Sequence, residues 1–91
     1  MALVVQCVNK ESNPRDCRDI KSIGIPGKYK DVVTKKPEEM YDLIENEGRD
    51  VVVEHNGIRT DVNGVKRGTT KYVRSKPNDT KDDNLLKPPI C

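Results

Sequence analysis

The feature that most constrains the fold is a pair of strand-like runs, 51–55 and 58–62, joined by Asn56-Gly57. Both runs are rich in β-branched residues, which favour strands. Asn and Gly tolerate positive φ, and this dipeptide between two such runs is the strongest short-range hairpin signal. The sequence therefore predicts a hairpin with a two-residue turn. Its expected pairs are His55 with Ile58, Val53 with Thr60 and Val51 with Val62 on one face, and Glu54 with Arg59 on the other.

Further strand-like segments lie before and after this hairpin. Residues 3–8 are rich in valine and predict a largely buried first strand. Residues 18–25 predict a second strand, and residues 70–74 predict a last one. The turn before this last strand is expected either at Asn63-Gly64 or at 66–68, because spacing favours neither.

One amphipathic helix is predicted to begin at Pro37. Proline suits the first turn of a helix because its missing N–H would have no partner there. Gly48 supplies the stop, since glycine readily turns left-handed after a helix. The short Val32-Val33 before the helix predicts no more than a fragment. The apolar stripe that must dock on a sheet consists of Met40, Leu43 and Ile44.

The core that joins these elements must be aliphatic, because the 91 residues include three Tyr but no Phe and no Trp. A chain of this length supports a single domain, here residues 1–91. We expect an α+β fold: a small, mainly antiparallel sheet of four or five strands with one packed helix. Residues 77–84 are predicted to be a mobile loop, and residues 85–91 an extended segment packed on the body.

Hydropathy argues against a membrane protein. No stretch approaches the roughly 18 apolar residues that a membrane-spanning helix requires. The apolar run at 2–5 is too short for a secretory signal and has no basic residues before it. The expected location is therefore cytoplasmic, with no membrane partner.

A combination of short motifs spans nearly the whole chain and resembles the family of short bacterial and archaeal proteins known as domain of unknown function 3892. The resemblance implies a shared fold and carries no catalytic residues. The matching motifs are Cys7-Val8-Asn9-Lys10, Ile20 to Gly24, Pro37-Glu38-Glu39, Lys71-Tyr72-Val73 and Asn84-Leu85-Leu86 leading to Cys91.

Three cysteines without a CxxC spacing favour reduced thiols over a disulfide framework or a zinc ribbon. Cys7 and Cys91 still form a candidate thiol pair if the tail lies beside the first strand. A zinc site would need Cys7, Cys17, His55 and Cys91 to converge, so no metal is expected. The chain also lacks a phosphate-binding glycine motif and any recognisable nucleophile with its base. We therefore expect neither an enzyme nor a cofactor.

Charge is distributed unevenly, although the formal net charge is only +2. Residues 66–76 are basic and contain no acid, whereas the helix region is acidic. A basic strand with an exposed tyrosine can bind phosphates and stack on a base, which makes nucleic acid an alternative partner. The candidate contacts are Lys66, Arg67, Lys71, Tyr72 and Arg74.

The absence of reactive constellations favours a non-enzymatic interaction module. Small antiparallel sheets have edges on which another chain can pair. We therefore expect this chain to bind a protein partner or its own copy. Nucleic-acid binding through residues 66–76 and a thiol or metal site at Cys7 and Cys91 are the alternatives.

Overall fold

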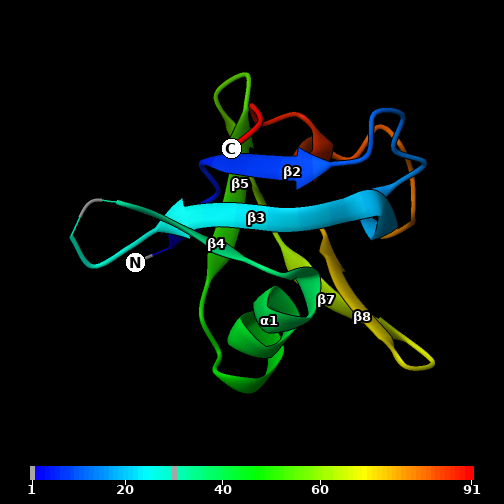
Figure 1. Cartoon of the computed structure of the whole chain (residues 1–91), viewed down its shortest axis with the longest axis horizontal. Helices are drawn as coiled ribbons and strands as arrows, with labels where there is room; N and C mark the ends of the chain where they lie inside the picture. Colours follow the sequence, from blue (N-terminus) through cyan, green and yellow to red (C-terminus); the bar gives the residue numbers. More distant parts are fainter. Residues whose placement is uncertain (1, 30) are drawn as a thin grey trace.

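The computed structural model describes residues 2–29 and 31–91. Within these residues it contains eight strands and one helix of ten residues (Figure 1). The expected α+β class is confirmed, but the expected single sheet of four or five strands is wrong. The strands form three small sheets, ordered β1-β5-β6, β2-β3-β4 and β7-β8.

The first sheet is built around the predicted hairpin. Strand β5 (Val51–His55) pairs with β6 (Ile58–Asp61) in the expected register, and Glu54 contacts Arg59 at 2.9 Å. The turn residues have φ values of 53° at Asn56 and 77° at Gly57, as this type of turn requires. On its other side β5 pairs in parallel with the two-residue strand β1 (Leu3–Val4).

The second sheet lies across the front of the molecule in Figure 1. It consists of β2 (Cys7–Lys10), β3 (Ile20–Pro26) and β4 (Val32–Lys35), all antiparallel. Strand β4 covers the Val32-Val33 segment that was expected to be a fragment only. It forms because β3 offers a complete partner edge, which the local sequence does not reveal.

The third sheet is a two-stranded hairpin of β7 (Asn63–Arg67) and β8 (Thr70–Arg74). Its turn includes Gly68 with a φ of 60°, which decides between the two expected turn positions. Figure 1 shows this hairpin projecting beyond the helix.

The division into three sheets follows from two interruptions in otherwise continuous strands. The predicted strand 3–8 breaks at Val5 and Gln6, whose backbone N–H groups donate to Val52 and Gly24 in different sheets. The chain also breaks at Val62, between β6 and β7. At each break the chain leaves one sheet and enters the next. Because small sheets twist, this change of direction lets the three sheets enclose a common core.

The helix begins at Pro37 as predicted. Helix α1 (Pro37–Tyr41) continues into the π-helical turn η2 (Asp42–Asn46), and Gly48 follows with a φ of 69°. The backbone N–H of Lys36 donates to a carboxylate oxygen of Glu39 at 2.9 Å, which caps the first turn. Met40 is fully buried, whereas Leu43 and Ile44 are half-buried against the core.

The aliphatic core lies between the three sheets and the helix. The fully buried side chains include Val8, Ile23, Met40, Val53 and Leu85, joined by Tyr72 as the single buried ring among the described residues. Two short 3₁₀ turns complete the fold, η1 (Cys17–Asp19) and η3 (Asn84–Leu86).

The C-terminal tail runs back along β2. The backbone N–H of Val8 donates to the carbonyl of Pro89 at 2.9 Å, and Val8 bridges Ile90 in parallel. Leu85 and Leu86 are buried. The tail therefore covers the free edge of β2.

Candidate partner-binding groove

An open groove of about 520 Å³ lies beside the end of β3 and the start of β4. Its volume falls within the range of known ligand sites, roughly 300–1,000 Å³. Strands β1, β3 and β4 contribute apolar side chains, and the helix adds one more. The apolar lining residues are Leu3, Ile25, Pro26, Val33 and Leu43.

The groove adjoins an open strand edge. Strand β4 is the last strand of its sheet and pairs only with β3. Among the described residues, no other main-chain hydrogen bond involves residues 32–35. An antiparallel strand directs about half of its backbone groups away from its single neighbour. These groups of β4 are therefore free to pair with another chain.

The two faces of β4 differ in what they contact. Val33 and Ile25 are opposite each other and line the groove, and Lys35 lies on the same face as Val33. Val32 and Thr34 lie on the other face and are exposed. An added strand would thus direct every second side chain into the groove.

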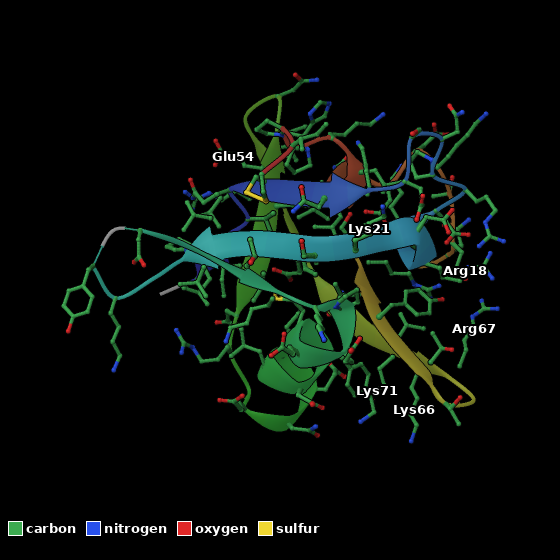
Figure 2. All side chains as sticks on the ribbon, viewed as in Figure 1. Arg18, Lys21, Glu54, Lys66, Arg67 and Lys71 are labelled. Atoms are coloured by element: carbon green, nitrogen blue, oxygen red, sulfur yellow. A yellow bond between two sulfur atoms is a disulfide. The ribbon has the colours of Figure 1, made fainter. Side chains whose placement is uncertain are left out.

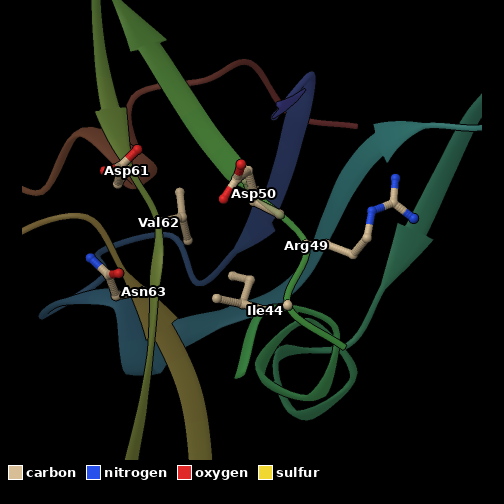
Figure 3. A pocket seen from close by; sticks show the side chains of 8 residues that line it. Ile44, Arg49, Asp50, Asp61, Val62 and Asn63 are labelled. Atoms are coloured by element: carbon tan, nitrogen blue, oxygen red, sulfur yellow. The ribbon is translucent and has the colours of Figure 1, made fainter. Parts of the chain in front are cut away.

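Three cationic side chains border the groove, namely Lys28, Lys35 and Arg49. The described part of the lining includes no acid. Lys28 and Arg49 are exposed, whereas Lys35 is half-buried. Figure 3 shows Arg49 extending away from Asp50 and Asp61 and towards β3 and β4. The site is thus apolar at its floor and positive at its rim.

A smaller pocket of about 160 Å³ lies on the other side of the segment that follows the helix (Figure 3). Its lining combines the apolar Ile44 and Val62 with the polar Arg49, Asp50, Asp61 and Asn63. Within the described residues no group of three metal-ligating side chains comes together. Its volume lies below the roughly 300–1,000 Å³ that is usual for ligand sites, so we place no function there.

The basic segment of the sequence is largely occupied by contacts within the molecule. Lys66, Arg67 and Lys71 point outwards along one side in Figure 2. However, Arg67 and Arg74 both contact Asp79, at 2.8 and 2.7 Å. Lys71 lies 3.7 Å from Asp42 and 5.4 Å from the centre of the Tyr41 ring. Of the expected basic contacts, only Lys66 has no ion-pair partner among the described residues.

The expected stacking ring is not accessible either. Tyr72 is only 2% exposed, and its hydroxyl donates to Asp79 at 2.8 Å. Burial, followed by the Asp79 carboxylate, raises the pKa of Tyr72. Tyr72 is therefore a core residue, and it cannot stack on a base while the core is closed. Nucleic-acid binding by residues 66–76 stays a prediction, and Tyr72 does not offer an exposed ring on which a base could stack.

Cys7 and Cys91 are joined by a disulfide, drawn in yellow at the start of β2 in Figure 2. This departs from the expectation of reduced thiols. The tail brings the two Cα atoms to 4.8 Å, although 84 positions separate them in sequence. A Cβ atom at Gly24 would lie 2.3 Å from the Cys7 sulfur, so glycine leaves the space that the bridge occupies.

Two further candidates for a reactive side chain are the free Cys17 and the single histidine, His55. Cys17 is buried, and burial together with the nearby Asp83 carboxylate raises the pKa of its thiol far above the ordinary value. A thiol in this state is a poor nucleophile. His55 is half-buried beside the hairpin turn and contacts the side chain of Asn56 at 3.3 Å.

Two aspartates anchor the segment that was expected to be a mobile loop. Asp79 accepts from Tyr72 and Arg74, while the fully buried Asp83 accepts from the backbone N–H groups of Ser75, Lys76 and Leu85. The Ser75 hydroxyl also donates to Asp83. Mobility of residues 77–84 stays a prediction, and these anchors oppose large movements.

Sequence reasoning missed the groove because its residues are scattered along the chain. The sequence does show that Lys28 follows Pro26-Gly27, which ends a predicted strand, and that Arg49 follows Gly48, which ends the predicted helix.

No helix within the described residues has the length and apolar character needed to cross a bilayer. Comparisons with known protein families, curated proteins and solved structures find no match.

Proposed function

We propose that this chain is a non-enzymatic interaction module that binds an extended segment of a protein partner along β4. The observation that carries the proposal is the open β4 edge directly beside an apolar groove. A segment that adds to a sheet edge gains affinity from main-chain hydrogen bonds and specificity from pockets for alternate side chains. Both parts lie together at this edge.

The exposed apolar residues support a binding role for the same region. Tyr29 is 88% exposed and Val32 is 51% exposed, and both belong to the β3–β4 hairpin. Natural proteins usually protect edge strands by charge, proline, bulges or coverage. The tail covers the β2 edge, whereas no segment among the described residues covers β4, whose protection is limited to its short length and the charge of Lys35.

The first test uses a capped eight-residue peptide in which valine alternates with serine. Amide exchange of the oxidised protein is followed by NMR with and without the peptide. Binding along β4 is expected to slow exchange at residues 32–35, because outward N–H groups gain partners.

Two variants of the same strand provide the matched comparison. Val33→Lys places a charge in the groove, whereas Thr34→Lys places it on the opposite, exposed face. The first variant is expected to lose peptide binding and the second to retain it, with circular dichroism confirming that both are folded. Protection elsewhere on the molecule, or equal loss in both variants, would overturn the proposal. Concentration-dependent dimerisation through β4 would instead identify a second copy as the partner.

A further inference from the structure

The charges around the groove indicate which kind of segment it binds. Its rim has the cations Lys28, Lys35 and Arg49, while its described lining contains no carboxylate. The whole chain has a net charge of only +2, so three cations without an acid in one lining are more than the average composition would place there. The rim therefore differs from an ordinary mixed surface, in which both signs are interspersed.

Every other arginine of the described chain has a carboxylate partner within the molecule, whereas several other lysines form no ion pair with a described residue. Arg15, Arg18, Arg59, Arg67 and Arg74 each contact a carboxylate at 3.0 Å or less. None of the three rim cations takes part in an ion pair with a described residue. Their charge is thus available to a bound molecule.

The three rim cations are not equivalent. Lys35 also borders a second hollow of about 240 Å³ that is lined by Glu39, Asp42 and Glu47. These acids reduce the positive potential on that side. Arg49 has no acid beside it in the lining of the groove and points away from Asp50 and Asp61 in Figure 3. The Asp31 carboxylate lies against Gly27, next to Lys28. With two cations and this one acid, the end of the groove that contains Lys28 and Arg49 keeps a positive excess, whereas Lys35 borders three acids.

Resting on the proposed function, we infer that the partner segment is acidic as well as aliphatic. Its aliphatic side chains fill the floor formed by Ile25, Val33 and Leu43, and its carboxylates contact Lys28 and Arg49. Such complementarity fixes the register of the bound strand and rejects basic segments. The neighbouring helix acids near Lys35 would repel a carboxylate placed at the other end, so the charge pattern also selects the direction of the bound strand.

The test compares three capped eight-residue peptides with serine at every even position, valine at positions 3 and 5, and glutamate, serine or lysine at positions 1 and 7. The valines and the variable residues then share the face that enters the groove. Affinities for the oxidised full-length protein are measured by NMR titration at low and at physiological salt. The glutamate peptide is expected to bind about tenfold more tightly than the lysine peptide at low salt. The difference is expected to shrink as salt increases, because the rim charges are exposed.

Charge-reversal variants separate the groove from general electrostatics. The double variant Lys28→Glu and Arg49→Glu is expected to reverse the preference, so that the lysine peptide binds better. Lys66→Glu is the control, because this exposed lysine has no ion-pair partner among the described residues and does not line the groove. It is expected to retain the preference for glutamate.

The results separate the acidic character of the partner segment from the proposed binding along β4. Equal affinities for the three peptides would overturn the inference and leave the proposed function intact. A glutamate preference that survives in the double variant, or is lost in Lys66→Glu, would also overturn the inference. Failure of all three peptides to bind would overturn the proposed function and the inference together.

Discussion

The C-terminal region, residues 63–91, and the β3–β4 hairpin differ in whether their polar groups have partners within the molecule. In the C-terminal region the charges of Arg67 and Arg74 meet Asp79, and the buried Asp83 satisfies three backbone N–H groups. In the hairpin, the backbone groups of β4 that point away from β3 and the cation of Lys28 have no partner among the described residues. The comparison teaches that a cluster of charge in the sequence need not be a binding surface. Here the basic cluster forms ion pairs within the fold, whereas the β3–β4 hairpin, which has no conspicuous sequence motif, has an unpaired strand edge.

The largest expected effect concerns the disulfide that holds the end of the C-terminal region. Replacing Cys7 and Cys91 by serine is expected to lower the free energy of unfolding by about 4 kcal/mol, because the bridge closes a very long loop of the unfolded chain. Urea denaturation of the double variant and of the oxidised parent measures the difference. Parent protein treated with a dithiol reductant is the control and is expected to match the variant. A loss below about 1 kcal/mol would show that the tail is held by packing alone.

The next effect tests the carboxylate anchor itself. Asp83→Ala is expected to lower the free energy of unfolding by about 3 kcal/mol, because it leaves buried N–H groups of Ser75 and Leu85 without an acceptor. Asp83→Asn retains one acceptor oxygen and is expected to cost less. Urea denaturation at pH 7 measures both variants. Equal stability of the alanine variant and the parent would contradict the role of Asp83 as an anchor.

A smaller effect is expected from the second anchor, and it depends on pH. Burial raises the pKa of Asp79, but hydrogen bonds from Tyr72 and Arg74 and the charge of Arg67 outweigh burial and hold it below its usual value. A carboxyl group with a lowered folded pKa adds stability above its ordinary pKa of about 3.9, and this stability is lost as pH falls further. Asp79→Asn is therefore expected to cost about 2 kcal/mol at pH 7 and progressively less below pH ~4.

Urea denaturation of the parent and the Asp79→Asn variant at pH 7, 4 and 2.5 measures this dependence. Glu54→Gln serves as a comparison, since Glu54 forms its ion pair with Arg59 on the exposed surface of the β5–β6 hairpin. Exposed ion pairs contribute little, so this variant is expected to change stability far less. A pH-independent cost of Asp79→Asn would show that the lost contacts do not depend on the carboxylate charge.

Local signals in the sequence were sufficient for elements that depend on their own residues. Asn56-Gly57 determined the hairpin and its register, and Pro37 and Gly48 marked the helix ends. Strand β4 could not be predicted because its pairing depends on β3 rather than on Val32-Val33 itself. The division into three sheets likewise depends on breaks at 5–6 and 62 that appear only when each strand has found its partner.

The candidate site was harder to predict than the fold for a related reason. The basic segment was visible as a charge run, but its partners Asp42 and Asp79 lie outside that run. The groove was invisible because Leu3, Lys28 and Arg49 come from three distant parts of the chain. Whether a charge is paired within the molecule is decided by tertiary contacts, which a charge run does not specify.

The smallest expected effect on stability comes from the rim of the groove, and it is the sharpest test of the comparison. Lys28→Glu and Arg49→Glu change exposed side chains without an ion-pair partner among the described residues, so each is expected to change the free energy of unfolding by less than about 0.5 kcal/mol. Urea denaturation at pH 7 measures each variant, with Lys66→Glu as the control. A loss above about 1 kcal/mol in a rim variant alone would mean that the rim charge stabilises the fold. The contrast between a satisfied C-terminal region and an open hairpin would then be wrong, because Lys28 or Arg49 would already have a partner inside the molecule.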